Sequence, residues 1–301
     1  FETLCKEAAK YGIGIVLDGV FSHTGSDSRY FNREGRYGEG GAYRDPNSPY
    51  RSWYDFDPKY KGGYRSWWGF ETLPEVNEET PSFVEFITGK GGVIDTWLRR
   101  GAAGFRLDVA DELPDAFIEK IRAAVKRVSP EKFLLGEVWE DATTKYGFGH
   151  RRTYLLGKGL DSVMNYPFKN AVLDFVKGKP AQQAMNEILS ICEHYPTPAL
   201  NTALNFLSTH DTERALTVIA DEPANGRGRE WQSSRNVSGE AYEEGMLRLR
   251  MAYAIIYTLP GLPCLYYGDE IGMQGYRDPF NRGYYCWDSH EERLKPVLAQ
   301  L

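Results

Sequence analysis

The sequence has few cysteines, no long apolar run and no cluster of positive charge. Its cysteines are far apart and form no CxxC pair, so they predict neither a disulfide framework nor a zinc site: Cys5, Cys192, Cys264 and Cys286. No stretch reaches the length of a transmembrane helix, and no membrane partner is expected. The 36 Lys and Arg residues are outnumbered by 42 Asp and Glu residues and form no basic stripe. This balance disfavours nucleic acid as a partner and favours a neutral substrate.

The sequence gives little information on location. Reduced thiols are the default for cysteines of this kind, which favours the cytoplasm. The first ten residues, FETLCKEAAK, indicate the end of an amphipathic helix and not a signal peptide, so we expect the chain to begin inside a longer protein. The location of the full-length protein and its oligomeric state, with a homodimer as one option, are left open.

Several catalytic signatures are absent, because no GxSxG elbow, Walker A loop, HExxH helix or GxGxxG turn follows an expected strand. Aromatic residues are plentiful at 14%, and several lie in polar, glycine-rich stretches without a predicted core face. Sugar rings stack on such side chains, although packing under an irregular loop is an equal alternative. For Trp67 and Trp68 we expect a position along or above a binding cleft.

Short apolar runs alternate with helical patterns along the chain. The apolar runs cover residues 13–17, 104–109, 133–138, 162–165, 203–207 and 264–267. The helical patterns cover residues 82–100, 113–128, 182–194 and 242–258. This alternation predicts an α/β fold with a parallel sheet built from βα units. Residues 24–77 interrupt it, and we interpret them as an inserted subdomain after the first of these strands, of a length that usually carries function.

Polar residues lie at or just beyond the carboxyl ends of four of the expected strands: Asp18, Asp108, Glu137 and the pair His210 and Asp211. In a parallel αβ barrel, the carboxyl ends of the strands form the face that holds the active site. One such acid could be a helix cap, but four at the same relative position are hard to assign to capping. Converging carboxylates suit glycoside hydrolysis, in which a protonated acid serves the leaving oxygen and an ionised carboxylate attacks the anomeric carbon.

Six motifs resemble those of the α-amylase superfamily in the family's own order, and the match is to its neopullulanase, cyclomaltodextrinase and maltogenic amylase group. They are DGVFSH at 18–23, LPEVN at 73–77, GFRLDVADE at 104–112, GEVWEDA at 136–142, FLSTHDTE at 206–213 and GLPCLYYGDEIGM at 261–273. The VADE string resembles the VANE of that group, whereas LPEVN departs from its typical MPKLN. The resemblance implies a (β/α)8 TIM barrel. Because the family's first motif follows the third strand, residues 1–301 would be a catalytic barrel fragment with strands three to eight.

The resemblance also assigns roles to individual residues. Asp108 matches the nucleophile, Glu137 the general acid/base, and Asp211 the third carboxylate, which binds sugar hydroxyls and stabilises the transition state. Arg106 would hold the nucleophile ionised and oriented through a charge-assisted contact.

Further positions match residues that bind sugar or support the site. His23 and His210 match hydrogen-bond partners of the same sugar, and Asp18 matches a structural acid behind the group. Asp278 and Arg282 have the family's Asp-x-x-x-Arg spacing at the next subsite, with a surface ion pair as the alternative.

Two residues resemble family positions on the leaving-group side of the site. They are Trp139 and Glu112, although Trp139 could equally pack against the protein.

The family's calcium site uses an Asn and a His at positions occupied here by Ser22 and Glu112. Serine is a poor calcium ligand, so we predict no metal and no other cofactor, and these motifs do not support calcium in the full-length protein.

We therefore expect retaining hydrolysis of α-1,4-glucosidic bonds, with α-1,6 bonds as a further option, in maltodextrins or starch-type glucans. The partner would be an α-glucan oligosaccharide or polysaccharide. A transglycosylase or isomerase of the same superfamily is the alternative, since it would use the same carboxylates. A non-catalytic carbohydrate-binding or transporter-associated relative is disfavoured because all three carboxylates are present. In a retaining mechanism, the carboxyl groups of Asp108 and Glu137 should lie about 5 to 6 Å apart.

Overall fold

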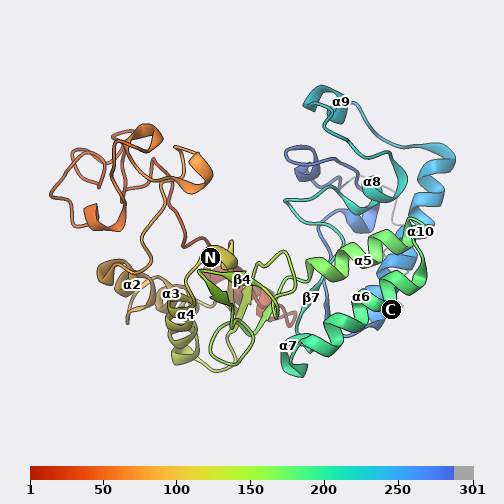
Figure 1. Ribbon diagram of the computed structural model, residues 1–301, viewed down its shortest axis with the longest axis horizontal. Coiled ribbons are helices and arrows are strands. Elements are labelled where there is room, and N and C mark those ends of the chain that lie inside the picture. The colour runs from red at the N-terminus through yellow and green to blue at the C-terminus, as the bar shows by residue number, and fades with distance from the viewer. Residues whose placement is uncertain (288–301) are drawn as a thin grey trace. The chain divides into compact units, whose positions relative to one another are not determined.

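The computed structural model describes residues 1–287, which fold as two compact units (Figure 1). The first unit contains residues 1–138 and 142–162, and the second contains residues 139–141 and the described residues from 163 onward. Both units are built from helices and short parallel strands, so the predicted α/β class is confirmed. No sheet closes on itself among residues 1–287. The number of strands in a complete barrel stays a prediction.

The first unit is organised around three parallel strands. They are β1 (Val16–Gly19), β2 (Gly104–Leu107) and β3 (Phe133–Gly136). Gly104 lies opposite Val16 on one side and opposite Phe133 on the other. A Cβ on Gly104 would lie 2.1 Å from the carbonyl oxygen of Phe133, so only glycine permits this approach of the two strands. β2 is buried at every position, as is typical of a central strand.

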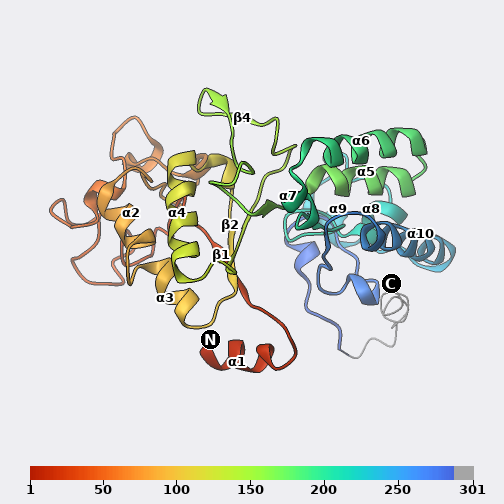
Figure 2. The ribbon, with the colours of Figure 1, turned by 90° about the horizontal axis from the view of Figure 1, so that it is seen from below.

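Four α-helices belong to the first unit: α1 (Glu2–Ala9), α2 (Pro81–Thr88), α3 (Val93–Arg99) and α4 (Asp115–Val128). Helices α2, α3 and α4 pack together (Figures 1 and 2). The single helix predicted over 82–100 is wrong, because glycines separate α2 from α3. A Cβ on Gly89 would lie 2.4 Å from the carbonyl oxygen of Glu85, and Gly91 has φ +77°.

The segment 24–77 contains no α-helix and no regular strand, as its irregular pattern indicated. It has three short 3₁₀ turns: η1 (Arg51–Trp53), η2 (Lys61–Gly63) and η3 (Trp67–Gly69). An isolated antiparallel bridge joins His23 to Glu75 near the two ends of the segment. Its interior is aromatic: Phe31 and Tyr64 are fully buried, with ring centroids 4.7 Å apart. Part of the aromatic content of this segment therefore serves packing.

A short hairpin in the first unit was not predicted. Strands β4 (Tyr146–Gly147) and β5 (His150–Arg151) are antiparallel and joined by Phe148 and Gly149. Both connecting residues have positive φ, +52° and +79°, which is the conformation of a tight type I′ turn. Phenylalanine is rarely found there, so the sequence carried no turn signal.

The second unit is mainly helical. Its helices are α5 (Tyr166–Val176), α6 (Ala181–His194), α7 (Thr197–Asn201), α8 (Ala215–Ala220), α9 (Arg229–Ser233) and α10 (Gly239–Thr258). α5 packs against α6 and α10, and α10 also packs against α8 (Figure 2). Two short strands, β7 (Leu204–Asn205) and β8 (Leu262–Pro263), pair in parallel. β6 (Ser162–Val163) lies where the chain passes from the first unit to the second.

The second unit differs from the sequence predictions at one strand and at one helix. The strand expected at 264–267 is β8, which ends at Pro263; the Cys264 N–H still donates to the Asn205 carbonyl, and the chain then leaves the strand. Helix α5 was not predicted, although its start has an N-terminal signal. The side-chain oxygen of Asn165 accepts a hydrogen bond from the Phe168 N–H, and Pro167 occupies the first turn.

None of the helices in residues 1–287 combines the length and the apolar character needed to cross a membrane.

Candidate active site

Three acidic residues come from neighbouring strands of the first unit. Asp108 directly follows β2 and Glu137 directly follows β3, as predicted. Leu107 and Gly136, the residues before them, are register partners, so the two acids leave their strands at the same level. Asp18 was expected after its strand, but it lies within β1, because this strand spans Val16–Gly19 and not 13–17. It is the register partner of Arg106 in β2.

Arg106 binds all three of these acids. Its Nη1 lies 2.7 Å from Asp18 Oδ1 and 2.7 Å from Asp108 Oδ1, and its Nη2 lies 2.9 Å from Glu137 Oε2. Burial disfavours the charged guanidinium, but Glu137 and the two aspartates outweigh this effect and raise the pKa of Arg106. One permanent cation therefore faces three carboxyl groups. We define Asp18, Arg106, Asp108 and Glu137 as the acid cluster.

The acids differ in their access to solvent. The side chain of Glu137 is 4% exposed, that of Asp108 21% and that of Asp18 52%. Glu137 Oε2 also accepts a hydrogen bond of 2.9 Å from the Val109 N–H. The acid cluster thus combines an enclosed carboxyl group with one that a ligand can reach.

The backbone beside Asp108 is strained. Val109 has φ +39° and ψ +51°, in the left-handed region that β-branched residues avoid. Hydrogen bonds hold the conformation on both sides: the Asp108 N–H donates to the Gly19 carbonyl, and the Ala110 N–H donates to the Glu137 carbonyl. Strain fixed by its surroundings is often found at functional sites.

His23 belongs to the same region. Its Nδ1 lies 2.9 Å from Ser22 Oγ, and its ring centroid lies 5.3 Å from that of Trp67. Burial lowers the pKa of His23, although Asp108 and Glu112 oppose the change. A neutral imidazole at neutral pH can both donate and accept a hydrogen bond, as a sugar hydroxyl requires.

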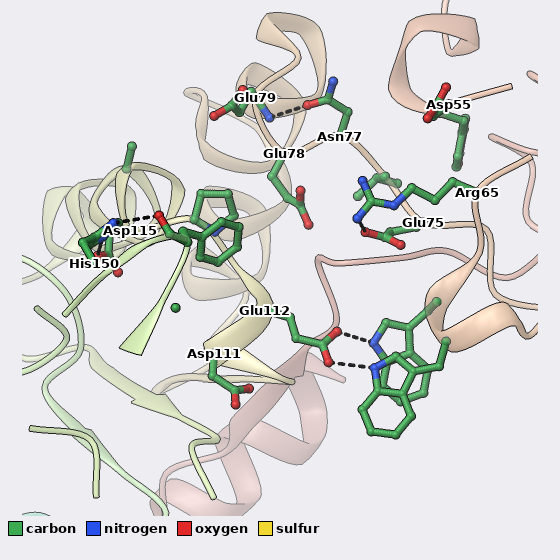
Figure 3. Close-up of a pocket in the computed structure, with 18 residues that line it drawn as sticks. Asp55, Arg65, Glu75, Asn77, Glu78, Glu79, Asp111, Glu112, Asp115 and His150 are labelled. Atoms are coloured by element: carbon green, nitrogen blue, oxygen red, sulfur yellow. Dashed lines mark hydrogen bonds and ion pairs between the residues drawn. The ribbon is translucent and has the colours of Figure 1, made fainter. Parts of the chain in front are cut away.

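Trp67 and Trp68 are held by a carboxylate. Trp67 Nε1 donates to Glu112 Oε2 at 2.6 Å, and Trp68 Nε1 donates to Glu112 Oε1 at 2.8 Å (Figure 3). The two indole rings stack with centroids 5.2 Å apart and planes inclined by 22°. Trp68 is 75% exposed. The sequence placed these three residues near a site but gave no sign that one carboxylate binds both indoles.

An open cavity of about 1190 Å³ lies against the tryptophans. Its walls come from the inserted segment, from the connection that follows β2 and from the β4–β5 hairpin (Figure 3). Glu75, Glu78 and Asp111 line it, and burial raises the pKa of Glu78 to about 7. Arg65 binds Glu75 at 2.7 Å on the same wall. Sequence reasoning missed this acidic lining, since its members lie in irregular stretches and not at strand ends.

The second unit holds the other predicted site residues. His210 Nε2 lies 3.1 Å from Asp211 Oδ2, and Arg282 lies 3.5 Å from Asp211 Oδ1 and 3.4 Å from Asp278 Oδ1. The predicted pair Asp278 and Arg282 thus lies beside Asp211. His210 and Asp211 do not follow the strand directly as expected, because β7 ends at Asn205.

Asn281 was missed by the sequence analysis. It lies in η6 (Phe280–Arg282), and its side-chain amide donates to the carbonyl oxygens of His210 and Thr212 at 2.7 and 2.8 Å. These bonds fix the backbone on both sides of Asp211. Neither the residue type nor its spacing could have predicted this partner.

Trp139, also in the second unit, stacks on Tyr166 with ring centroids 4.2 Å apart and planes inclined by 14°. Its side chain remains 43% exposed. Trp139 therefore packs against the protein, as the alternative interpretation of this residue predicted, and its partner is Tyr166. The exposed part of its ring remains accessible to a ligand.

No group of three or more His, Cys, Asp and Glu side chains within residues 1–287 is arranged to hold a metal ion. The expected absence of a cofactor stays a prediction.

Comparison with known proteins gives consistent matches. The family described as alpha amylase, catalytic domain, matches residues 1–295. An amylopullulanase from Thermoanaerobacter thermohydrosulfuricus is 35% identical over 339 residues, covering 100% of this chain and 21% of the relative. Neopullulanase 2 from Thermoactinomyces vulgaris is 31% identical over 301 residues, covering 97% of this chain and 44% of the relative. Cyclomaltodextrinases and a maltogenic alpha-amylase also match.

Among solved structures, cyclic alpha-maltosyl-(1-->6)-maltose hydrolase from Arthrobacter globiformis superposes with a TM-score of 0.81 at 25% identity. The match covers 100% of this chain and 60% of that one. The chain therefore spans about a fifth of the length of the amylopullulanase and less than two thirds of the solved structure.

Proposed function

Since the chain belongs to the alpha-amylase catalytic domain family, whose hydrolases are glycoside hydrolases, we propose that it carries the catalytic centre of a retaining α-glucan hydrolase. Its substrates would be α-1,4-glucosidic bonds of maltodextrins or starch-type glucans, with α-1,6 bonds also accepted. The observation that carries the proposal is the acid cluster, in which Arg106 binds the carboxyl groups of Asp108 and Glu137 at once.

The first step forms a glycosyl-enzyme. Arg106 binds Asp108 through Oδ1, which orients Oδ2 to attack the anomeric carbon. As the bond from that carbon to the leaving oxygen breaks, Glu137 in its protonated form transfers its proton to the leaving oxygen. Both carboxyl groups contact the same guanidinium, which favours the close spacing of about 5 to 5.5 Å that a retaining mechanism needs.

The second step releases the sugar. Glu137, now ionised, accepts a proton from a water molecule, whose oxygen attacks the anomeric carbon while the bond to Asp108 breaks. We assign hydrogen bonds to sugar hydroxyls to His23 and to Asp211 with its neighbour His210. Asp278 and Arg282 would border the next sugar, and Trp139 would contact the leaving group.

The test is Asp108→Asn, which retains the side-chain volume but cannot attack. We expect hydrolysis of maltoheptaose to fall by about 10⁴-fold or more, with an unchanged far-UV circular dichroism spectrum. The matched control is Asp57→Asn, which should retain full activity. Asp57 is a carboxylate of the inserted segment that pairs with Lys59. Substantial activity in Asp108→Asn would contradict the nucleophile assignment.

The configuration of the first product tests retention separately. NMR of early reaction mixtures should detect the α-anomer, and a β-anomer would contradict a double displacement. A transglycosylase would be recognised by products longer than the substrate, and an isomerase by a new linkage without net hydrolysis.

A further inference from the structure

The Trp67–Trp68 pair is unusual for surface tryptophans. Trp68 exposes 75% of its area, an unfavourable arrangement for a large apolar ring in water. Its backbone has φ +50° and ψ +25°, a left-handed conformation that is rare for a bulky residue. An exposed ring on a strained backbone persists only where other contacts hold it. Stability of the fold does not explain why this ring should be held in solvent.

Glu112 provides the contacts that hold the pair. It lies in η4 (Ala110–Glu112), on the connection after β2 that begins with Asp108. Each of its carboxylate oxygens accepts one indole N–H, at 2.6 and 2.8 Å. Hydrogen bonds to an ionised acceptor are stronger than neutral ones, and two of them fix both rings relative to β2. Because both oxygens are occupied, Glu112 is suited to positioning and not to proton transfer.

The Trp67–Trp68 pair has neighbours in the acid cluster's surroundings and in the cavity. The Trp67 ring contacts the His23 ring, and His23 in turn lies within electrostatic reach of Asp108. Both tryptophans also line the cavity of about 1190 Å³. This volume is above the range of about 300 to 1,000 Å³ for pockets that bind one drug-sized ligand. A glucan chain with several units is a ligand of that size.

The chemistry of the cavity matches a neutral polyhydroxyl ligand. The exposed indole face offers an apolar surface for the C–H face of a pyranose. The carboxylates of Glu75, Glu78 and Asp111 can accept hydrogen bonds from hydroxyl groups.

We propose that Glu112 is a positioning residue that holds Trp67 and Trp68 as a stacking platform, and that the platform and its cavity bind glucosyl units remote from the reacting bond. The inference rests on the proposed function and deepens it, because it assigns the preference for long over short α-glucans to these residues. A preorganised platform loses little conformational entropy when the sugar binds.

The experiment compares Glu112→Gln, Glu112→Ala and Trp68→Ala on maltoheptaose and maltotriose. Because a remote contact binds ground state and transition state alike, KM for maltoheptaose should rise roughly five- to tenfold in Trp68→Ala and Glu112→Ala, while kcat stays within about twofold. KM for maltotriose should change less than twofold. Glu112→Gln should be intermediate, since the amide oxygen can accept one indole N–H and its NH₂ group cannot accept the other.

Controls separate this inference from the proposed function. Glu119→Gln removes an exposed carboxylate on α4 and should leave both KM values unchanged. Calorimetric titration of maltoheptaose into Asp108→Asn, with and without Glu112→Ala, measures binding without turnover. Glu112→Ala should weaken this binding by the same factor by which it raises KM.

The inference would be overturned if wild type, Glu112→Ala and Trp68→Ala had equal KM values for maltoheptaose and melted alike, and hydrolysis would still be established. If the wild type did not hydrolyse glucans, the titration alone would decide: a loss of binding supports the platform, and unchanged binding rejects it.

Discussion

Arg106 in the first unit and Arg214 in the second are both buried arginines, but their partners differ. Arg106 is 11% exposed in its side chain and faces three carboxyl groups. Arg214 is fully buried and pairs with one carboxylate, Asp269, whose side chain is 1% exposed. The first group has an excess of negative charge beside solvent, whereas the second is balanced one to one inside the protein.

The environment of Arg214 is that of a structural pair. Asp269 also accepts a hydrogen bond of 2.9 Å from Tyr253, and the guanidinium lies over the rings of Tyr266 and Tyr267 at 4.7 and 4.9 Å. Burial raises the pKa of Asp269 to about 6, so the carboxylate is ionised at pH 7 and the pair is neutral overall. A neutral, enclosed pair holds parts of a fold together, whereas a cluster with more acids than cations beside solvent keeps acids available for a ligand.

The largest expected effect is that of Arg214→Ala on stability. The change leaves Asp269 buried without its cation, so the free energy of unfolding should fall by about 3–5 kcal/mol. Urea denaturation followed by tryptophan fluorescence measures the loss. Arg282→Ala, at an arginine 44% exposed beside Asp278, is the matched control and should cost less than about 1 kcal/mol. Equal losses for the two variants would show that the Arg214 pair has no special structural role.

The corresponding change in the acid cluster should affect activity. In Arg106→Ala, Asp108 loses the contact that orients it and Glu137 loses its cation, so kcat should fall by about 10²- to 10³-fold. Initial rates on maltoheptaose measure the loss, and Arg99→Ala, an exposed arginine that pairs with Asp95, is the control. Retained activity in Arg106→Ala would contradict the role of the shared cation.

A smaller effect concerns Glu78 and pH. Burial raises the pKa of Glu78 from 4.5 to about 7, so between these values the folded state binds more protons than the unfolded state. Stability therefore falls as pH rises from about 4.5 to 7. Glu78→Gln removes this slope, and the variant should be more stable than wild type at pH 8 by about 1–3 kcal/mol and equal at pH 4.

Urea denaturation at pH 4, 6 and 8 measures the contribution of Glu78. Glu79→Gln, at the exposed neighbouring position, should keep the slope of the wild type. If the slope also persisted in Glu78→Gln, its source would lie in other groups.

Two members of the acid cluster, Asp108 and Glu137, were predictable from the sequence because each directly follows a buried strand. An apolar run predicts a buried strand, and in a parallel sheet the carboxyl ends of the strands meet at one edge. Asp108 and Glu137 were therefore placed correctly without tertiary information. Asp18 was expected just after its strand but lies within it, because the apolar run ends at residue 17 whereas the hydrogen-bonded strand continues to Gly19.

The platform and the cavity could not be predicted in the same way. Glu112 and Trp68 are 44 positions apart in sequence, and the bond between them depends on how an irregular segment folds back. No periodicity describes a segment of turns and isolated bridges. The split between α2 and α3 is an intermediate case: the glycines at 89, 91 and 92 are visible in the sequence, but the helical spacing of apolar residues continues past them and so predicts one helix.

The sharing of one guanidinium has a consequence for how this site can change in evolution. Asp18 and Asp108 both accept a hydrogen bond from the same Nη1 of Arg106. A substitution at one of them alters the charge and geometry that the other experiences, so their effects cannot add as those of separate sites do. Acceptable replacements at these positions are therefore conditional on one another, and a route that changes both residues one at a time passes through an intermediate in which Nη1 keeps only one of its two carboxylate partners.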